Sequence, residues 1–247
     1  MIFIIACIIS FLPYFFLYLW LKNLHKDDEA YRKLCSNALI RGVLCVFPVI
    51  LFSGITYFLI RMTRVQDTNP LLYQALYKFI VLALVEETVK FLAFRKVLKK
   101  SDYPFSWMDM TACASIVGLG FGALEGVVYA IGASVPVVLI RGFTVPHVGY
   151  GFLVGYFYGK AEKTGKPFYK WVGFGLSWLL HGMYDFSLSD EFMAINDNLV
   201  VVPFILVFID VVLVIMLISF VRKSKKREEY RTPLPGRERP DENQKAE

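Results

Sequence analysis

The feature that most constrains this chain is a group of charges inside an apolar run from Leu71 to Phe94. The run is long enough to cross a bilayer as a helix, because about 20 apolar residues span the hydrocarbon core. It contains Glu86, Glu87 and Lys90, and each charge near a helix centre opposes insertion by roughly 2.5–3.5 kcal/mol. On a helix, Lys90 lies one turn beyond the glutamates, so one ion pair can form. The second carboxylate must therefore meet a metal, a histidine, a proton or water supplied by other helices.

The composition indicates a polytopic membrane protein. Of the 247 residues, 56% are apolar and 16% are aromatic, and the apolar residues come in blocks of about 20. We therefore predict an all-α transmembrane helix bundle with about seven spans, which forms a single domain over residues 1–221. The predicted spans are residues 2–22, 39–61, 71–94, 110–132, 135–159, 170–188 and 198–221.

The connections between these spans alternate in charge. The first, third and fifth connections and the start of the tail are rich in lysine and arginine. The second connection holds only Arg61 and Arg64, and the sixth is acidic, with Asp190, Glu191 and Asp197. Because basic connections stay in the cytoplasm, we predict an amino terminus outside the cell and a cytoplasmic carboxyl terminus.

The net charge of +6 does not indicate a nucleic-acid partner, since the basic residues lie between apolar runs and in the tail. Residues 222–247 mix charges of both signs with three prolines and contain little to bury, so we predict a disordered cytoplasmic tail. Four scattered cysteines without CxxC spacing favour inert packing residues over a metal or disulfide framework.

Two predicted spans carry glycine at every fourth position. Small residues at this spacing let helix backbones approach closely in a membrane. We therefore expect the fourth and fifth spans to pack tightly and to bring Glu125 and His147 toward the bundle interior. Pro146, beside His147, should kink the fifth span. The glycines are Gly118, Gly122 and Gly126 in the fourth span and Gly151, Gly155 and Gly159 in the fifth.

Further ionisable residues lie on the sixth and seventh spans. His181 and Asp185 are four residues apart, so the aspartate can accept a hydrogen bond from the ring and fix its tautomer. One buried charge is often a structural hydrogen-bond clasp, but five ionisable positions on four spans favour a functional centre. Asp210 belongs to no motif.

Paired carboxylates and histidines suit the activation of water by a general base or a metal. The zinc-protease signature HExxH is absent, and His25, one of only three histidines, lies in the first cytoplasmic connection. These facts disfavour a three-histidine zinc site. A site with two histidines and one carboxylate stays open.

Three motifs on successive helices resemble the PrsW family of intramembrane proteases. They are Glu86-Glu87-x-x-Lys90, Phe121-x-x-x-Glu125 and His181-x-x-x-Asp185, with His147 between the second and the third. The related CAAX-protease and bacteriocin-immunity group has a similar glutamate pair, but its arginine follows one position later and a histidine ends its Phe motif. The resemblance covers about half of the chain, from the third to the sixth span.

The resemblance implies a bacterial plasma-membrane protease that cleaves membrane-anchored proteins such as anti-sigma factors. In this hypothesis Glu86 or Glu87 activates water, and Lys90 orients the pair. His147 and His181 are metal ligands or oxyanion donors, and Asp185 orients His181. Because the family is classed with metalloproteases, we expect zinc, with His147, His181, Glu87 and Glu125 as candidate ligands; a metal-free glutamate mechanism stays open.

Two other classes compete with this hypothesis. A proton- or ion-coupled transporter also uses intramembrane Glu, His and Asp residues, although the sequence shows no internal repeat of the kind that transporter folds often carry. In a non-catalytic scaffold or immunity protein, the same charges would only hold helices together.

Overall fold

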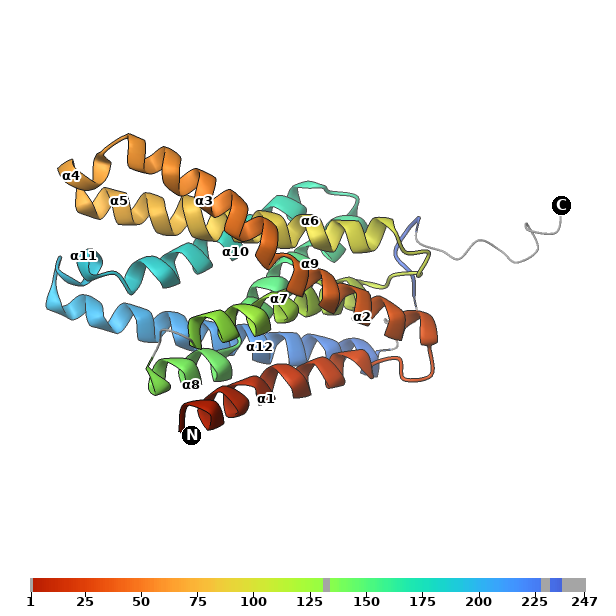
Figure 1. Cartoon of the computed structure of the whole chain (residues 1–247). Coiled ribbons are helices and arrows are strands. Elements are labelled where there is room, and N and C mark those ends of the chain that lie inside the picture. Colours follow the sequence, from red (N-terminus) through yellow and green to blue (C-terminus); the bar gives the residue numbers. More distant parts are fainter. Residues whose placement is uncertain (1, 131–133, 228–231, 237–247) are drawn as a thin grey trace.

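The computed structural model of the chain describes residues 2–130, 134–227 and 232–236, and these residues form helices without a β-strand. Figure 1 shows long helices that run roughly side by side along one axis. The α-helices are α1 (Ile2–Lys22), α2 (Glu29–Leu44), α3 (Val46–Met62), α4 (Val65–Thr68), α5 (Pro70–Leu76), α6 (Val85–Lys99), α7 (Trp107–Ala130), α8 (Val135–Thr144), α9 (Pro146–Thr164), α10 (Phe168–Ser187), α11 (Asp190–Met193) and α12 (Val201–Lys226). A π-helix, η1 (Tyr77–Leu84), joins α5 to α6, and a 3₁₀ helix, η2 (Asp197–Val200), precedes α12.

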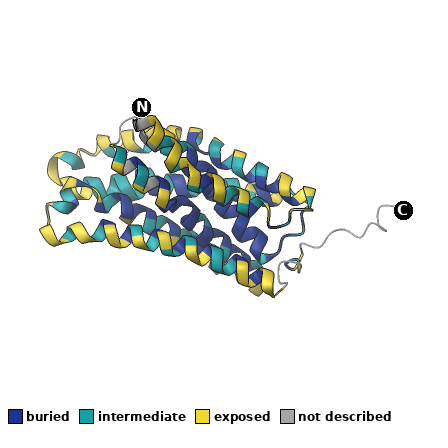
Figure 2. Cartoon of the chain, turned by 90° about the horizontal axis from the view of Figure 1, so that it is seen from below, coloured by how far each residue is buried: buried dark blue, intermediate teal, exposed yellow. Residues whose placement is uncertain are grey.

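The described helices include four stretches that are long and apolar enough to cross a membrane. These are Glu29–Met62, Trp107–Val128, Val138–Thr164 and Asp197–Lys226. Most residues of the second and third stretches are buried, whereas most of the first and fourth are not. Figure 2 shows the buried residues, in dark blue, in the interior of the bundle and the exposed ones, in yellow, on its outer helices. Helices α7 and α9 therefore form the centre of the bundle, with α3 and α12 at its periphery. Apolar side chains that α3 and α12 expose suit contact with lipid.

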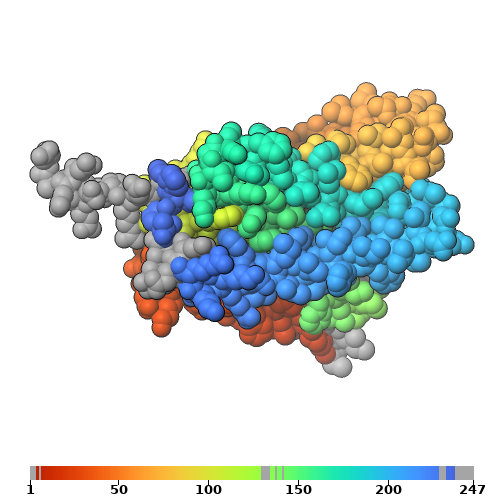
Figure 3. Space-filling view, turned by 180° about the vertical axis from the view of Figure 1, so that it is seen from behind, coloured from red at the N-terminus to blue at the C-terminus, as the bar shows by residue number. Residues whose placement is uncertain are grey.

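The outer face of α12 can be followed in the space-filling view. In Figure 3 this helix, in blue, runs across the surface with α1, in red, beside it. Phe204 and Phe208 of α12 are among its exposed aromatic side chains. A large apolar surface of this kind on a helical bundle is typical of membrane proteins.

Close contact between α7 and α9 depends on glycine, as predicted. A β-carbon on Gly118 would collide with the carbonyl oxygen of His147, and one on Gly151 would collide with the carbonyl oxygen of Ala114. The two backbones thus touch directly, which the small-residue pattern predicts. Gly126, at the other end of the first stripe, has no neighbour among the described residues near its β-carbon position, so it takes no part in this contact with α9.

The fifth predicted span is two helices and not one kinked helix. Helix α8 ends at Thr144, Val145 has a left-handed backbone with φ of 40°, and Pro146 is the first residue of α9. Proline suits this position because the first residue of a helix needs no backbone N–H. The break places His147 in the first turn of α9, in the interior of the bundle.

The third predicted span changes its helical form just before the paired glutamates. The wider turns of η1 precede α6, and side chains from two other helices bind its backbone carbonyls. Trp178 Nε1 donates to the carbonyl of Phe79 at 2.7 Å, and Ser53 Oγ donates to that of Val81 at 2.9 Å. The π-helix is rare and frequently marks a functional site.

Part of the predicted tail is ordered against the bundle. Helix α12 continues to Lys226, beyond the predicted end of the last span at residue 221. Leu234 is only 4% exposed, and its backbone N–H donates to the carbonyl of Phe105 at 2.8 Å. The other parts of the predicted tail, at 228–231 and 237–247, lie outside the described residues, as do positions 131–132 of the fourth predicted span.

Candidate active site

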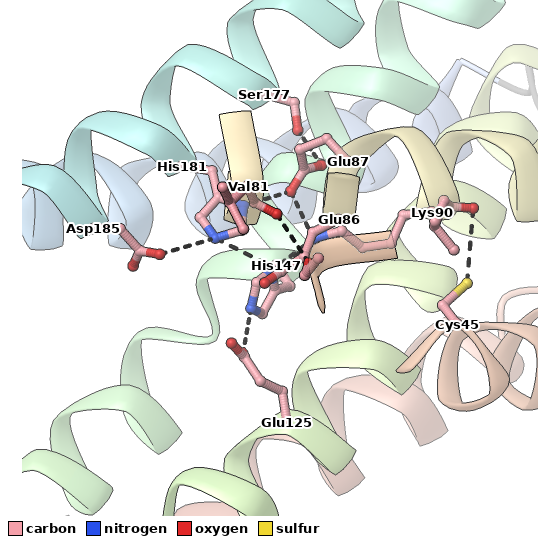
Figure 4. A network of polar contacts seen from close by, with 12 residues as sticks. Cys45, Val81, Glu86, Glu87, Lys90, Glu125, His147, Ser177, His181 and Asp185 are labelled. Carbon is pink, nitrogen blue, oxygen red and sulfur yellow. Dashed lines mark hydrogen bonds and ion pairs between the residues drawn. The ribbon is translucent and has the colours of Figure 1, made fainter. Parts of the chain in front are cut away.

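Glu87 on α6 is the most strongly held carboxylate of the polar centre (Figure 4). Its Oε1 accepts from Lys90 Nζ at 2.6 Å and from His181 Nδ1 at 2.8 Å. Its Oε2 accepts from the hydroxyl of Ser177 at 2.6 Å. Ser177 and His181 lie one turn apart on α10, so this helix presents two donors to one carboxylate. A carboxylate offers about four acceptor sites, and Glu87 uses three of them.

Glu86, its neighbour in the sequence, is buried but bound much less tightly. Its Oε2 has no hydrogen-bond partner among the described residues. Lys90 Nζ lies 3.8 Å from this oxygen, and His181 Nε2 lies 3.7 Å from it. The expectation that one carboxylate of the pair would be left over is therefore met by Glu86. A buried anionic oxygen without a partner is costly unless the working protein supplies a cation or a donor.

The contacts of His181 decide which of its ring nitrogens is available. A carboxylate only accepts, so Nδ1 carries the hydrogen that it donates to Glu87. The other nitrogen, Nε2, faces Oε2 of Glu86 at 3.7 Å. The predicted hydrogen bond with Asp185 is not formed, because its carboxylate oxygen lies 3.8 Å from Nε2. Glu87, on another helix, accepts the ring hydrogen bond that the sequence predicts for Asp185.

His147 is oriented in the same manner by two other groups. Lys90 Nζ lies 2.9 Å from Nδ1, and an ammonium only donates, so Nδ1 accepts. Nε2 therefore donates to Oε2 of Glu125, which lies on α7, at 2.6 Å. The ammonium also lies 4.5 Å from the centre of the Phe121 ring, where a cation is stabilised by the ring face.

Three buried residues form a group that can hold a metal ion. Glu86, His147 and His181 each offer one donor atom, and the three atoms lie within 4.8 Å of one another. Two histidines and one carboxylate are a catalytic zinc ligand set, and the unpartnered Glu86 oxygen fits a ligand role. Glu87 and Glu125, the other two predicted ligands, each accept a hydrogen bond from one histidine. Metal-binding histidines usually donate to a carboxylate in this way.

A small cavity of about 10 Å³ lies beside these groups. Glu87, Lys90 and His147 form its polar wall, and apolar side chains of α6, α7 and α9 form the remainder. A volume of about 10–15 Å³ accommodates a single water molecule when polar partners are present. The space next to Glu87 thus suits one water molecule.

Two members of the site received no role from the sequence. Ser177 lies one helical turn before His181, and this spacing is the signal that could have identified it as a partner of the same carboxylate. Tyr150 lies three residues after His147 on α9, and its ring stacks on His181 with 5.3 Å between ring centres. An aromatic residue at that spacing is common in any helix core, so the sequence alone does not distinguish it.

Comparison with known proteins adds a family assignment. A family model described as PrsW family intramembrane metalloprotease matches residues 17–217. The chain is 30% identical over 181 residues to Protease PrsW of Bacillus subtilis (strain 168), a match that covers 70% of this chain and 76% of that protein. It is 29% identical over 176 residues to Protease PrsW of Geobacillus kaustophilus (strain HTA426), covering 69% and 73%. No solved structure matches the chain.

Proposed function

Because this chain belongs to the PrsW family of intramembrane metalloproteases, we propose that it hydrolyses a peptide bond of a membrane-anchored protein at the Glu86–His147–His181 centre. The observation that carries this proposal is the buried Oε2 of Glu86, which faces both histidines without a hydrogen-bond partner in the described chain. A structural clasp would leave no such oxygen, since buried polar groups of that kind are normally paired.

The proposed metal is zinc, held by Glu86, His147 and His181. When bound, Zn²⁺ supplies a Lewis acid that polarises a carbonyl oxygen and favours water as a nucleophile at neutral pH. Glu87 and Glu125 support the site differently, because each holds one imidazole in the tautomer that its contacts require. Both ring nitrogens of His147 have partners, so its use as a ligand exchanges one of these contacts for the metal.

Glu87 is our candidate for the group that takes a proton from water. One of its four acceptor sites is unused, and it lines the water-sized cavity. Lys90, 2.6 Å from Oε1, orients this carboxylate. If the centre works without metal, Glu86 is the alternative base, because its Oε2 is the oxygen without a hydrogen-bond partner.

The proposed topology has seven crossings in the bacterial plasma membrane, with the amino terminus outside. Seven helical rods support it: α1, α2–α3, α5–α6, α7, α8–α9, α10 and α12. In Figure 1 the α1–α2 and α6–α7 connections lie at the same end of the bundle as the last turn of α12. These basic connections would face the cytoplasm. The substrate class that the family resemblance implies is an anti-sigma-factor-like protein with a membrane anchor.

The test is proteolysis by the purified protein in detergent. The wild type should cleave a single-span membrane protein, whereas Glu86→Gln and Glu87→Gln should not, although both variants still insert and survive in detergent. The loss should lie in the rate, because the missing interactions belong to the transition state. If both variants retained full activity, this centre would not be the protease site, and the transporter or scaffold hypothesis would replace it.

A further inference from the structure

Tyr150 forms the third ring of the histidine cluster. Its ring stacks on His181 at an interplanar angle of 21° and meets the edge of His147, with 5.8 Å between ring centres. The two imidazoles lie 5.2 Å apart, so each of the three rings contacts the other two. The phenol therefore lies against both candidate metal ligands and is not a distant core residue.

The hydroxyl group of Tyr150 is the part that packing does not explain. The residue is only 1% exposed, and its Oη has no hydrogen-bond partner in the described part of the chain. Another buried tyrosine, Tyr31, behaves as expected, since its hydroxyl donates to the carbonyl of Leu21 at 3.1 Å. Phenylalanine would fill the space at position 150 equally well without leaving a buried donor unpaired.

Glu86 shows the same pattern within the same cluster. Its Oε2 and the Tyr150 Oη are both buried atoms without a hydrogen-bond partner, and both belong to side chains that surround His181. The cluster thus has one spare acceptor and one spare donor. A peptide group entering the site offers a carbonyl oxygen, which accepts a hydrogen bond and gains negative charge when water attacks it.

We propose that the Tyr150 hydroxyl donates a hydrogen bond to the carbonyl oxygen of the scissile peptide bond and stabilises the oxyanion that forms there. This inference rests on the proposed protease function. When water adds to the carbonyl carbon, one proton of the water passes to Glu87, the C=O π electrons move to the oxygen, and the phenol keeps its proton throughout. A neutral phenol suits this role, because it is a donor that the buried site already holds in a fixed orientation between two rings.

The test compares Tyr150→Phe with a matched variant, Tyr31→Phe, in the full-length protein. Each change removes one buried hydroxyl. Tyr150→Phe should lower kcat by about 10²–10³-fold, as the loss of one oxyanion donor does, with KM changed much less. Its melting temperature should stay equal to that of the wild type or rise, because no hydrogen bond of the resting protein is lost. Tyr31→Phe should show the reverse pattern: a lower melting temperature and an unchanged kcat.

Two results would overturn the inference. The first is a kcat for Tyr150→Phe within twofold of the wild type. The second is a fall in kcat that parallels a fall in melting temperature, since the hydroxyl would then support the fold. Glu86→Gln measured alongside separates the two proposals. If Glu86→Gln is inactive and Tyr150→Phe is fully active, only the role of Tyr150 fails, whereas full activity in Glu86→Gln removes the protease site itself.

Discussion

The carboxylate of Glu87 lies 2.8 Å from Nδ1 of His181, although the two residues are 94 positions apart in the sequence. This contact fixes the ring tautomer and leaves Nε2 facing Glu86. It also gives the two adjacent glutamates different surroundings. Glu87 is held by three donors, whereas the Oε2 of Glu86 faces the histidines without a hydrogen-bond partner in the described chain.

Removal of the Ser177 hydroxyl should weaken catalysis without removing any ligand. Its hydrogen bond to Glu87 Oε2 holds that carboxylate from the second side. We expect Ser177→Ala to lower kcat by about 10–100-fold, as changes behind a metal ligand do. Ser187→Ala is the matched control, because the hydroxyl of this buried serine of the same helix donates to the carbonyl of Tyr184. Equal activity of the two variants would contradict the role of Ser177.

The amount of bound metal should depend on the three proposed ligands and not on the charge of the site. Glu86→Gln, His147→Ala and His181→Ala should each lower the zinc bound per protein, measured by elemental analysis. Glu87→Gln should keep most of its zinc while losing activity, because in our proposal Glu87 is not a ligand but orients His181 and takes a proton from water. A strong chelator should abolish the proteolytic activity of the wild type, and added zinc should restore that activity.

His25→Ala is the control for this metal series. His25 pairs with Asp109 at 2.8 Å, in a separate polar cluster at the start of α7. Its replacement should leave the bound zinc unchanged. A fully active preparation that contains no metal would exclude zinc and leave the metal-free glutamate mechanism in its place.

The topology makes a prediction at the two ends of the last helix. A reporter fused after Leu188 should lie outside the cytoplasm, because the α10–α12 connection is acidic. A reporter fused after Lys226 should lie in the cytoplasm, where the basic end of α12 belongs. The opposite pattern at both positions would overturn the proposed orientation.

The ordered part of the tail should contribute to stability. Leu234→Ala removes a side chain that is buried against the bundle, and we expect it to reduce the free energy of unfolding by about 2 kcal/mol. Deletion of residues 228–247 should lower the melting temperature at least as much as Leu234→Ala does, whereas deletion of residues 237–247 should leave the melting temperature unchanged. Equal melting temperatures for the two deletions would show that the Leu234 contact adds nothing.

The contact between α7 and α9 can be tested with two alanine variants of one stripe. Gly118→Ala should lower the amount of folded protein and the activity, because its β-carbon meets the His147 backbone and must displace that residue. Gly126→Ala should be neutral or slightly stabilising, since its β-carbon position is open and alanine favours a helix. Thermal unfolding and activity of the two variants, compared side by side, check this contact.

The residue pattern alone predicts the fold class and the glutamates and histidines that the bundle brings together. Apolar blocks that contain Glu86, Glu87 and Lys90 require a helical bundle with a polar interior, because lipid offers no partners to charges or to an open backbone. Glycine at every fourth residue predicted the close contact of α7 and α9. These conclusions depend on local spacing, because residues three or four positions apart lie on the same face of a helix.

Which partner each polar group has depends on how the helices pack against one another. Glu86 and Glu87 differ by about 100° around one helix, so the rotation of α6 against α10 determines which of them meets His181. Because of this rotation, His181 forms its hydrogen bond with Glu87 and not with Asp185, its neighbour on α10. Sequence spacing describes one helix at a time, and these contacts join different helices.

The π-helix and the ordered tail also depended on distant contacts. Carbonyls of η1 receive hydrogen bonds from Trp178 and Ser53, which lie on α10 and α3. Leu234 is buried because Phe105, far away in the sequence, offers a backbone carbonyl beside an apolar surface. Composition predicted disorder for this segment, since a short proline-rich stretch buries little by itself. Its order comes from a surface that only the assembled bundle provides.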